Sequence, residues 1–521
     1  MPQSARQTAA RVYLVGGGPG DPRLITLRAV ECLRRADAVV YDYLVNPRVL
    51  AHAGQDAELI CLGRHGLGQP DRGRIMSQAE INATLIDLAR GGKTVVRLKG
   101  GDPAIFGHLA EEATALADAG IEFEIVPGVT AASAAASYAG IPLTHRDSAS
   151  AVAFVAGHQR GDATAVDLDA KALAAFPGTL VVYMGVTTAA TWTRELIAAG
   201  KPPDTPAAIV RRVSLPDQQR WICRLDEVAA RLAAGPVRPP VLVIVGDVVG
   251  DVGGRDAALD WFMRRPLFGR TVLVTRPASQ AEDLTAALLE LGADVLVQPA
   301  IEISAPDDAA AVDRIIDRLA EFEWLVFSSA NGVRYFLERV LENRDLRALG
   351  GVRLAAIGPG TAEALAQFHL RPDMLPDTYR AEALAEALAP LVAGRRVLLV
   401  RASRGREVLA KQITKSGGIV EQVVAYRSID VAAADGEVIA AIKAGRIDWI
   451  TVTSSAIARS LVNMFGERLH SCRLASISPL TTETLGGLGF AVAAEAAEYT
   501  MDGVVAAIAA AEATLPKRAE E

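Results

Sequence analysis

The chain has 521 residues, of which 50% are hydrophobic and 22% charged, and a formal net charge of −7. This length predicts about two to four domains, and the composition excludes wholesale disorder. The acidic balance argues against nucleic acid as the main partner. The four cysteines have no metal-ligand or disulfide-framework spacing, and no apolar run approaches the roughly 20 residues of a membrane helix. We therefore expect a cytoplasmic protein without a metal site or a membrane contact.

Short apolar runs alternate with Ala- and Leu-rich helical stretches along the whole chain. Most runs are β-branched and apolar at successive positions, which is typical of buried parallel strands. The sequence therefore predicts an α/β fold. The predicted strands, in chain order, are VYLVG, ADAVVYD, TVVRLKG, FEIVPG, TLVVYMG, VLVIVG, TVLVTR, WLVFSS, RVLLVR and WITVTS.

The first strand begins at Val12 and runs into the glycine turn GGPGDP. A dinucleotide fingerprint needs a third glycine where this chain has Asp21, and Pro19 has no N–H group to offer a phosphate. No Gly-Lys-Ser/Thr follows, so the turn is not a P-loop either. These features argue against a nicotinamide oxidoreductase. The turn instead predicts a site for a ligand other than a pyrophosphate.

Later stretches of the first half place small or polar residues at predicted strand ends. RLKGGDP ends a strand with Gly100, Gly101 and Asp102, and open α/β sheets bind ligands at such ends. VPGVTAAS leads into a small-residue helix whose first N–H groups are free. LVVYMG and TPAAIVRRV bring Met184 and Val213 to two further strand ends.

Together these motifs resemble uroporphyrinogen-III C-methyltransferase, from about Val12 to Val249. The matching stretches are GPGDP, VVYD, SQAEIN, RLKGGDP, VPGVTAAS with AGIPLTHRD, YMG and VGDVV. The resemblance implies a tetrapyrrole-methylase fold of two α/β subdomains that takes methyl groups from S-adenosylmethionine. The implied product of two transfers to uroporphyrinogen III is precorrin-2, a precursor of sirohaem and cobalamin. A homodimer through this half is also implied.

The resemblance further assigns roles to single residues. Asp42 matches the family's proposed proton acceptor. Arg64 stands where the family commonly has a lysine, proposed as a proton donor; an arginine is a poor acid, so Arg64 binds substrate carboxylates or that role is not essential. Arg146 pairs with a substrate propionate or with a local carboxylate. The implied cofactor contacts are Pro19, Gly100, Gly101, Asp102, Ile105, Thr130, Ala131, Met184 and Val213.

A break between two halves is expected after the turn-rich DVVGDVGG and around RRPLFGR. We predict a domain at 1–251, a linker at 252–268 and a second domain at 269–521.

The second half contains an internal repeat. The stretches that begin at Thr271, Trp324 and Val352 match those at Arg396, Trp449 and Cys472, in the same order. The offsets (396−271, 449−324 and 472−352) are 125, 125 and 120 residues. This pattern predicts two similar α/β lobes with a ligand site between them.

From about Gly269 to Ala511 the chain resembles uroporphyrinogen-III synthase, on VLVTRP, FSSANGVRYF, AAIGPGTAEAL, VVAYRS, VTSSAIARSL and YTMDGVVAAI. That family closes hydroxymethylbilane to uroporphyrinogen III without a cofactor. The resemblance implies that Tyr426 protonates the leaving hydroxyl. The expected substrate-binding residues of this half are Ser329, Thr361, Arg401 and Ser454.

The two halves would then catalyse consecutive reactions on small-molecule tetrapyrroles. One alternative is a methyltransferase fused to a non-catalytic two-lobed module that binds tetrapyrroles, because no strong catalytic constellation marks the second half. Another is a tetrapyrrole or diphthamide methyltransferase with a different acceptor, against which RLKGGDP and AGIPLTHRD argue.

Overall fold

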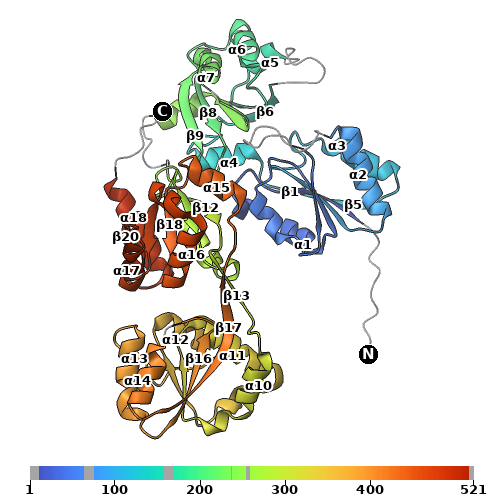
Figure 1. The fold of residues 1–521 in the computed structure, drawn as a ribbon. Helices are drawn as coiled ribbons and strands as arrows, with labels where there is room; N and C mark the ends of the chain where they lie inside the picture. Colours follow the sequence, from blue (N-terminus) through green and yellow to red (C-terminus); the bar gives the residue numbers. More distant parts are fainter. Residues whose placement is uncertain are drawn as a thin grey trace. The chain divides into compact units, whose positions relative to one another are not determined.

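The computed structural model describes residues 11–63, 76–157, 169–235, 237–253, 259–405 and 407–515. The chain separates into two compact units, Met1–Gly269 and Arg270–Glu521. Both units are built from five-stranded sheets with helices packed on them, which confirms the predicted α/β class (Figure 1). Among the described helices, none is long and apolar enough to cross a bilayer.

The first sheet of the first unit is entirely parallel. Residues along β1 alternate between two apolar cores, with Val12 and Leu14 in one and Tyr13 and Val15 in the other. This alternation explains why the strand is apolar at every position. The strand order is β3 (Glu58–Cys61), β2 (Ala38–Tyr41), β4 (Val95–Lys99), β1 (Val12–Gly16) and β5 (Phe123–Val126).

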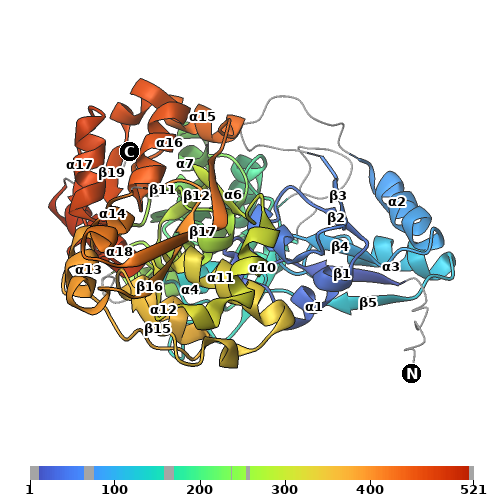
Figure 2. The same cartoon turned by 60° about the horizontal axis from the view of Figure 1, so that its bottom comes forward.

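Helices cover both faces of this sheet. The helix α1 (Leu27–Arg35) packs on one face through Cys32 and Leu33. On the other face, α2 (Gln78–Arg90) and α3 (Leu109–Asp118) lie side by side (Figure 2). With both faces covered, the loops at the carboxyl ends of the strands are where a ligand is expected to bind.

The second sheet of the first unit is mixed. The strand β10 pairs antiparallel with both β7 and β8, although its sequence, VLVIV, is as apolar as that of a buried parallel strand. The apolar pattern therefore reports burial on two faces and not strand direction. The order is β6 (Val152–Ala156), β7 (Thr179–Tyr183), β10 (Val241–Val245), β8 (Pro206–Arg211) and β9 (Gln219–Arg224).

Helices also cover both faces of the second sheet. One face packs on α4 (Ala131–Tyr138) and α8 (Asp247–Gly253). The other packs on α6 (Ala189–Ala198) and α7 (Val228–Ala234), with α5 (Ala170–Ala174) next to α6. The small residues of α4 let this helix lie close to the strands.

Residues 259–268, the described end of the predicted linker, pack on the first unit. The ring of Phe262 meets the ring of Tyr138 edge-on, with centroids 4.7 Å apart. Trp261 lies 5.1 Å from the same ring and donates its Nε1–H to the Ser137 carbonyl oxygen at 2.8 Å. This segment is therefore anchored to the end of α4, while the domain boundaries stay a prediction.

The second unit contains two lobes, which confirms that prediction. The sheet of the first lobe has the order β12 (Asp294–Val297), β11 (Thr271–Val274), β18 (Trp449–Val452), β19 (Arg473–Ser476) and β20 (Ala494–Glu495). The sheet of the second lobe has the order β13 (Ile301–Ser304), β17 (Ile419–Asp430), β16 (Arg396–Ala402), β14 (Trp324–Phe327) and β15 (Arg353–Ala356).

Helices flank both sheets of the second unit. The first lobe carries α9 (Glu282–Glu290), α15 (Gly436–Lys443), α16 (Ser455–Phe465), α17 (Pro479–Gly487) and α18 (Met501–Thr514). The second lobe carries α10 (Ala309–Asp317), α11 (Ala330–Asn343), α12 (Pro359–Gln367), α13 (Ala381–Leu388) and α14 (Val408–Lys415).

Each lobe combines elements from both copies of the sequence repeat. The strand β11, which opens the first copy, pairs with β18 of the second copy. The strand β16, which opens the second copy, pairs with β14 of the first. The orders β12-β11-β18-β19 and β17-β16-β14-β15 then correspond strand by strand. The paired strands β13 and β17 run between the two lobes and carry the chain across (Figure 1).

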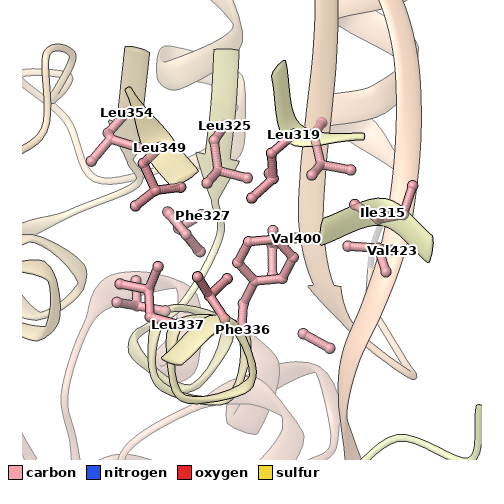
Figure 3. Close-up of a cluster of buried hydrophobic side chains, with 14 of the residues drawn as sticks. Ile315, Leu319, Leu325, Phe327, Phe336, Leu337, Leu349, Leu354, Val400 and Val423 are labelled. Atoms are coloured by element: carbon pink, nitrogen blue, oxygen red, sulfur yellow. The ribbon is translucent and has the colours of Figure 1, made fainter. Parts of the chain in front are cut away.

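The core of the second lobe lies between its sheet and α11 (Figure 3). Phe327 of β14 and Phe336 of α11 are fully buried, and their rings meet edge-on with centroids 6.1 Å apart. Leu325, Leu337 and Val400 complete this contact and are equally inaccessible. Each such side chain contributes about 1.5–3 kcal/mol through burial.

We predict that Phe262→Ala destabilises the first unit, because Phe262 is only 3% exposed and contacts three aromatic rings. Removing a buried phenylalanine costs about 3–5 kcal/mol. Amide hydrogen exchange of the full chain should become faster in α4 and stay unchanged in the second unit. Phe262→Leu, the control, keeps most of the apolar contact and should show a much smaller change. Unchanged exchange in α4 would contradict the anchoring of residues 259–268.

Candidate functional site

Three strand-end loops of the first unit meet at glycines. A Cβ atom added to Gly128, after β5, would lie 2.2 Å from the carbonyl oxygen of Gly101, after β4. One added to Gly16, at the end of β1, would lie 2.6 Å from the Cα of Gly128. Backbone hydrogen bonds of 2.7 and 3.2 Å also join Gly18 to Gly101. Only residues without a side chain permit this approach, which sets the loop of Pro19 against the loop after β4.

Asp102 connects two of these loops. Its Oδ2 accepts a hydrogen bond from the Gly128 N–H at 2.9 Å, and its Oδ1 accepts one from the Ala104 N–H at 2.8 Å. Ile105 continues the turn by donating its N–H to the Asp102 carbonyl oxygen at 3.3 Å. A carboxylate has about four acceptor positions, so Asp102 retains capacity for a ligand as well.

Tyr183 connects the end of β7 to the start of α4. Its hydroxyl lies 2.8 Å from Thr130 Oγ1 and accepts a hydrogen bond from the Ala132 N–H at 2.9 Å. Burial raises the pKa of Tyr183, which keeps the hydroxyl protonated at neutral pH. Thr130 and Ala131, two predicted cofactor contacts, are therefore held close to Met184, the residue after Tyr183.

Met184 and Val213 complete this group of loops. Met184 is 50% exposed and has a φ of +54°, a left-handed conformation that is uncommon for a side chain of this size. A Cβ atom added to Gly20 would lie 2.6 Å from the Val213 carbonyl oxygen, so Val213 lies against the glycine turn. The structure thus brings all nine predicted cofactor residues onto loops that are in mutual contact.

Asp21, the residue that excludes a dinucleotide fingerprint, is buried. Its carboxylate accepts hydrogen bonds from Arg23 at 2.9 Å and from the Tyr138 hydroxyl at 3.2 Å. Burial opposes ionisation, but the hydrogen bonds from Arg23 outweigh it and lower the pKa of Asp21. Burial and the Asp21 carboxylate raise the pKa of Tyr138 to about 12. Asp21 therefore anchors the glycine turn to α4.

Asp42, the predicted proton acceptor, follows β2 and keeps 28% of its side chain exposed. Its Oδ1 accepts a hydrogen bond from Arg97 Nη2 at 2.6 Å. A Cβ atom added to Gly100 would lie 3.0 Å from the Cβ of Leu44. The loop that carries Asp42 therefore touches the loop after β4, beside the predicted cofactor residues.

Arg146 and Arg64 stay predictions. Arg146 is exposed in a turn closed by two backbone hydrogen bonds of 2.9 Å between His145 and Ala149. Arg64 lies outside the residues that the structure describes.

In the second unit, Ser329 and Tyr426 are brought together. Ser329 caps α11 by accepting the Gly332 N–H at 3.0 Å, and its hydroxyl lies 2.9 Å from the Tyr426 hydroxyl. Tyr426 is 6% exposed, and its ring stacks on Tyr335 with centroids 5.8 Å apart. Burial raises the pKa of Tyr426, so the phenol stays protonated at neutral pH, as a proton donor must.

Of the other three predicted residues of this unit, Thr361 and Arg401 belong to the lobe of Ser329 and Tyr426, and Ser454 belongs to the other lobe; Arg401 precedes Ala402, the register partner of Tyr426 on β17. Thr361 is buried in the first turn of α12, and Ser454 caps α16 in the other lobe. Arg401 Nη1 bonds to Gln422 Oε1 at 2.8 Å and pairs with Glu407. This pairing must open before Arg401 can bind a substrate carboxylate.

Contacts between the two lobes include polar and aromatic pairs. Gln280 Nε2 donates to Asn331 Oδ1 at 2.6 Å, and the rings of Tyr379 and Tyr499 meet edge-on with centroids 6.4 Å apart. A groove of about 820 Å³ runs along α10 and β17, and none of the predicted site residues lines it.

Sequence reasoning missed Tyr183, Arg97, Lys99 and Glu112. The sequence pattern could have indicated Arg97 and Lys99. Two basic residues two positions apart in an apolar strand lie on the same face of the sheet. Tyr183 was marked only by its place before Met184. Nothing distinguished Glu112 from an ordinary surface glutamate.

Comparisons with known proteins match both units. The model of the tetrapyrrole (corrin/porphyrin) methylases matches residues 11–229, and that of uroporphyrinogen-III synthase HemD matches residues 282–506. The porphyrin biosynthesis protein HemD of Ruminiclostridium josui is 31% identical over 497 residues, which is 95% of each chain. The chain belongs to this porphyrin-biosynthesis family. It joins an N-terminal tetrapyrrole methylase domain to a C-terminal uroporphyrinogen-III synthase domain, as predicted.

The chain has further relatives. The uroporphyrinogen-III C-methyltransferase of Bacillus subtilis is 34% identical over 368 residues, 70% of this chain and 74% of that protein. A crystal structure of uroporphyrin-III C-methyl transferase from Thermus thermophilus, complexed with S-adenyl homocysteine, is 42% identical. That match has a TM-score of 0.39 and covers 46% of this chain and 93% of the other. The two family models and the relatives from Ruminiclostridium josui and Bacillus subtilis identify the chain as a tetrapyrrole biosynthesis protein.

We predict that Ser329→Ala costs the synthase domain more stability than Ser454→Ala. Both serines cap equivalent helices, so each replacement loses about 0.5–2 kcal/mol. Ser329→Ala also removes the partner of the buried Tyr426 hydroxyl, which costs about 1–3 kcal/mol more.

Pulse proteolysis of the full chain in urea measures both losses. Adding Tyr426→Phe to Ser329→Ala should bring the loss back toward that of Ser454→Ala, because no hydroxyl is then left unpaired. Equal losses in the two single variants would show that the contact between Ser329 and Tyr426 contributes nothing.

Proposed function

We propose that the chain catalyses two consecutive steps of tetrapyrrole biosynthesis. The synthase domain closes linear hydroxymethylbilane to uroporphyrinogen III and inverts the last pyrrole, without a cofactor. The methylase domain then places two methyl groups from S-adenosylmethionine on this ring and gives precorrin-2. The observation that carries the proposal is the convergence of nine predicted cofactor residues on contacting loops of the methylase domain.

The methylase loops suit S-adenosylmethionine. The crossing of Gly16, Gly101 and Gly128 leaves backbone atoms without side chains over them, and a ligand can approach such atoms closely. Asp102 has acceptor capacity for ribose hydroxyls or an amino group, and Met184 offers an exposed apolar side chain. The Thermus thermophilus relative in complex with S-adenyl homocysteine supports the same assignment. When bound, S-adenosylmethionine supplies an electrophilic methyl group.

The protein must align the acceptor carbon and take up a proton. Holding two reactants in register supplies a large part of a rate enhancement by itself. A pyrrole carbon that gains a methyl group leaves a cationic ring, which returns to neutrality by losing one proton. Asp42, which is partly exposed beside the cofactor loops, accepts this proton. Arg146 pairs with a propionate of the substrate, and Arg64 either does the same or is not essential.

In the synthase domain, Tyr426 donates a proton to the hydroxyl of hydroxymethylbilane, which leaves as water. Ser329 orients the phenol through the 2.9 Å contact between the two hydroxyls. Thr361, Ser454 and Arg401 bind the substrate, whose eight carboxylates require cations and hydroxyl donors. The homodimer through the methylase domain is also part of this proposal, as is a cytoplasmic location.

A product assay tests both activities. The purified chain receives hydroxymethylbilane under anaerobic conditions, with and without S-adenosylmethionine, and products are separated by mass and by isomer. We expect type III uroporphyrinogen without the methyl donor and a dimethylated product with it. Type I ring alone, the spontaneous product, would overturn the synthase activity and favour a two-lobed module that only binds tetrapyrroles. Type III ring that gains no methyl group would overturn the methylase activity.

We predict that Asp102→Asn weakens binding of S-adenosylhomocysteine about tenfold or more. An amide keeps only one acceptor oxygen, so it cannot accept both the Gly128 and the Ala104 N–H groups, and a lost charge-assisted bond costs about 1.5–3 kcal/mol. Isothermal titration calorimetry measures the affinity.

The control for this prediction is Asp345→Asn. Asp345 makes the same kind of local turn, with its carboxylate accepting the Arg347 N–H at 2.9 Å, but it belongs to the synthase domain. Its replacement should leave the affinity unchanged. Equal affinities for wild type and Asp102→Asn would remove Asp102 from the cofactor site.

A further inference from the structure

A network of buried charges lies directly behind Asp42. Arg97 and Lys99 are each 3% exposed, and Glu112 is completely buried. Glu112 Oε1 accepts hydrogen bonds from Arg97 Nε at 3.1 Å and from Lys99 Nζ at 2.5 Å. Arg97 Nη2 reaches Asp42 at 2.6 Å, so one guanidinium bridges two carboxylates.

Strand geometry explains how the network forms. Arg97 and Lys99 are two positions apart on β4 and therefore point to the same face of the sheet. That face packs on α3, which carries Glu112. Gln78 of α2 completes the shell, with Nε2 3.4 Å from Glu112 Oε1. Glu112 Oε2 has no hydrogen-bond partner in the part of the chain that the structure describes.

Stability does not account for this arrangement. Moving charged groups into a protein interior costs several kcal/mol per ion, and well-packed apolar residues are often equally stable or more so. Of the four charged groups, only Asp42 is appreciably exposed, at 28% of its side chain. In the described part of the chain, solvent or substrate can therefore reach this network only at Asp42, the carboxylate that the proposed function uses as proton acceptor.

We propose that Arg97, Glu112 and Lys99 are positioning residues that hold Asp42 ionised and in one orientation for the methyl-transfer reaction. This inference rests on the proposed function. Two cations and two carboxylates balance, and Lys99 gives Glu112 a second cation so that Arg97 stays shared with Asp42. Burial and the neighbouring guanidinium lower the pKa of Lys99. Among the described residues, Tyr43 is a further titratable group whose ionisation interacts with Asp42.

The test is the pH dependence of kcat/KM for uroporphyrinogen III, measured anaerobically on the full chain with saturating S-adenosylmethionine. Arg97→Gln removes the cation beside Asp42, so the carboxylate takes up a proton more readily. The acid limb of the profile should move to higher pH by about one unit or more. Glu112→Gln removes the competing carboxylate, so the acid limb should move to lower pH. Lys99→Met should move it upward, by less than Arg97→Gln.

A merely structural role of these residues would not shift the acid limb in opposite directions in Glu112→Gln and in the two variants that lose a cation. Lys93→Gln is the matched control, because it removes an exposed cation that pairs with Glu58 on the same sheet, and its acid limb should stay in place. Calorimetric binding of S-adenosylhomocysteine checks that each variant folds. If Arg97→Gln has lost this binding, the inference is tested with Glu112→Gln and Lys99→Met alone. The acid limbs of their pH profiles must then move in opposite directions.

Rates that fall uniformly at all pH values, with the acid limb unmoved, would overturn the inference and leave the proposed function standing. Shifts in the same direction for Glu112→Gln and Lys99→Met would also overturn it. A wild-type chain that transfers no methyl group at any pH would instead overturn the proposed function.

Discussion

The methylase domain depends on one close approach of backbone to backbone. Gly16, Gly101 and Gly128 end or follow three neighbouring strands, and a single methyl group at Gly128 would lie 2.2 Å from the Gly101 carbonyl oxygen. Alanine at that position would force the loops apart, because two backbones cannot yield as a flexible side chain does. The glycine turn that resembles a nucleotide motif therefore serves mainly to let these loops pack closely. Its ligand-binding capacity follows from the backbone atoms left open around it.

Buried polar groups fix the loops that these glycines bring together. Asp21 ties the glycine turn to α4, Asp102 ties the loop after β4 to the loop after β5, and Tyr183 ties β7 to the start of α4. Each bond satisfies a donor that burial would otherwise leave unpaired, so losing one costs more than the bond itself contributes. Residues 259–268 pack on Tyr138 at the C-terminal end of α4. Asp21 also contacts Tyr138, so both segments are positioned by the same side chain.

Parts of the candidate site were readable from the sequence. GGDP at a strand end and the small-residue stretch after VPGVT identified loops that the structure places in contact, because parallel strands end at one edge of a sheet. The partners of those residues were not readable. Arg97 is 55 positions from Asp42 and 15 from Glu112, and sequence spacing gives no information on which helix packs over which strand. Arg401 looked like a free cation until its pairing with Glu407 was visible.

The sequence by itself determined the α/β class, the buried strands and the two similar lobes of the second unit. These properties follow from local hydrophobic patterns and from an internal repeat, which need no knowledge of tertiary contacts. Only the tertiary structure decided that β10 runs antiparallel and that each lobe takes strands from both copies of the repeat. A buried strand must be apolar whichever way it runs, and two copies of one repeat offer equivalent edges for pairing. In the second unit the chain passes between the lobes through the antiparallel pair β13 and β17, and no local pattern encodes that pairing.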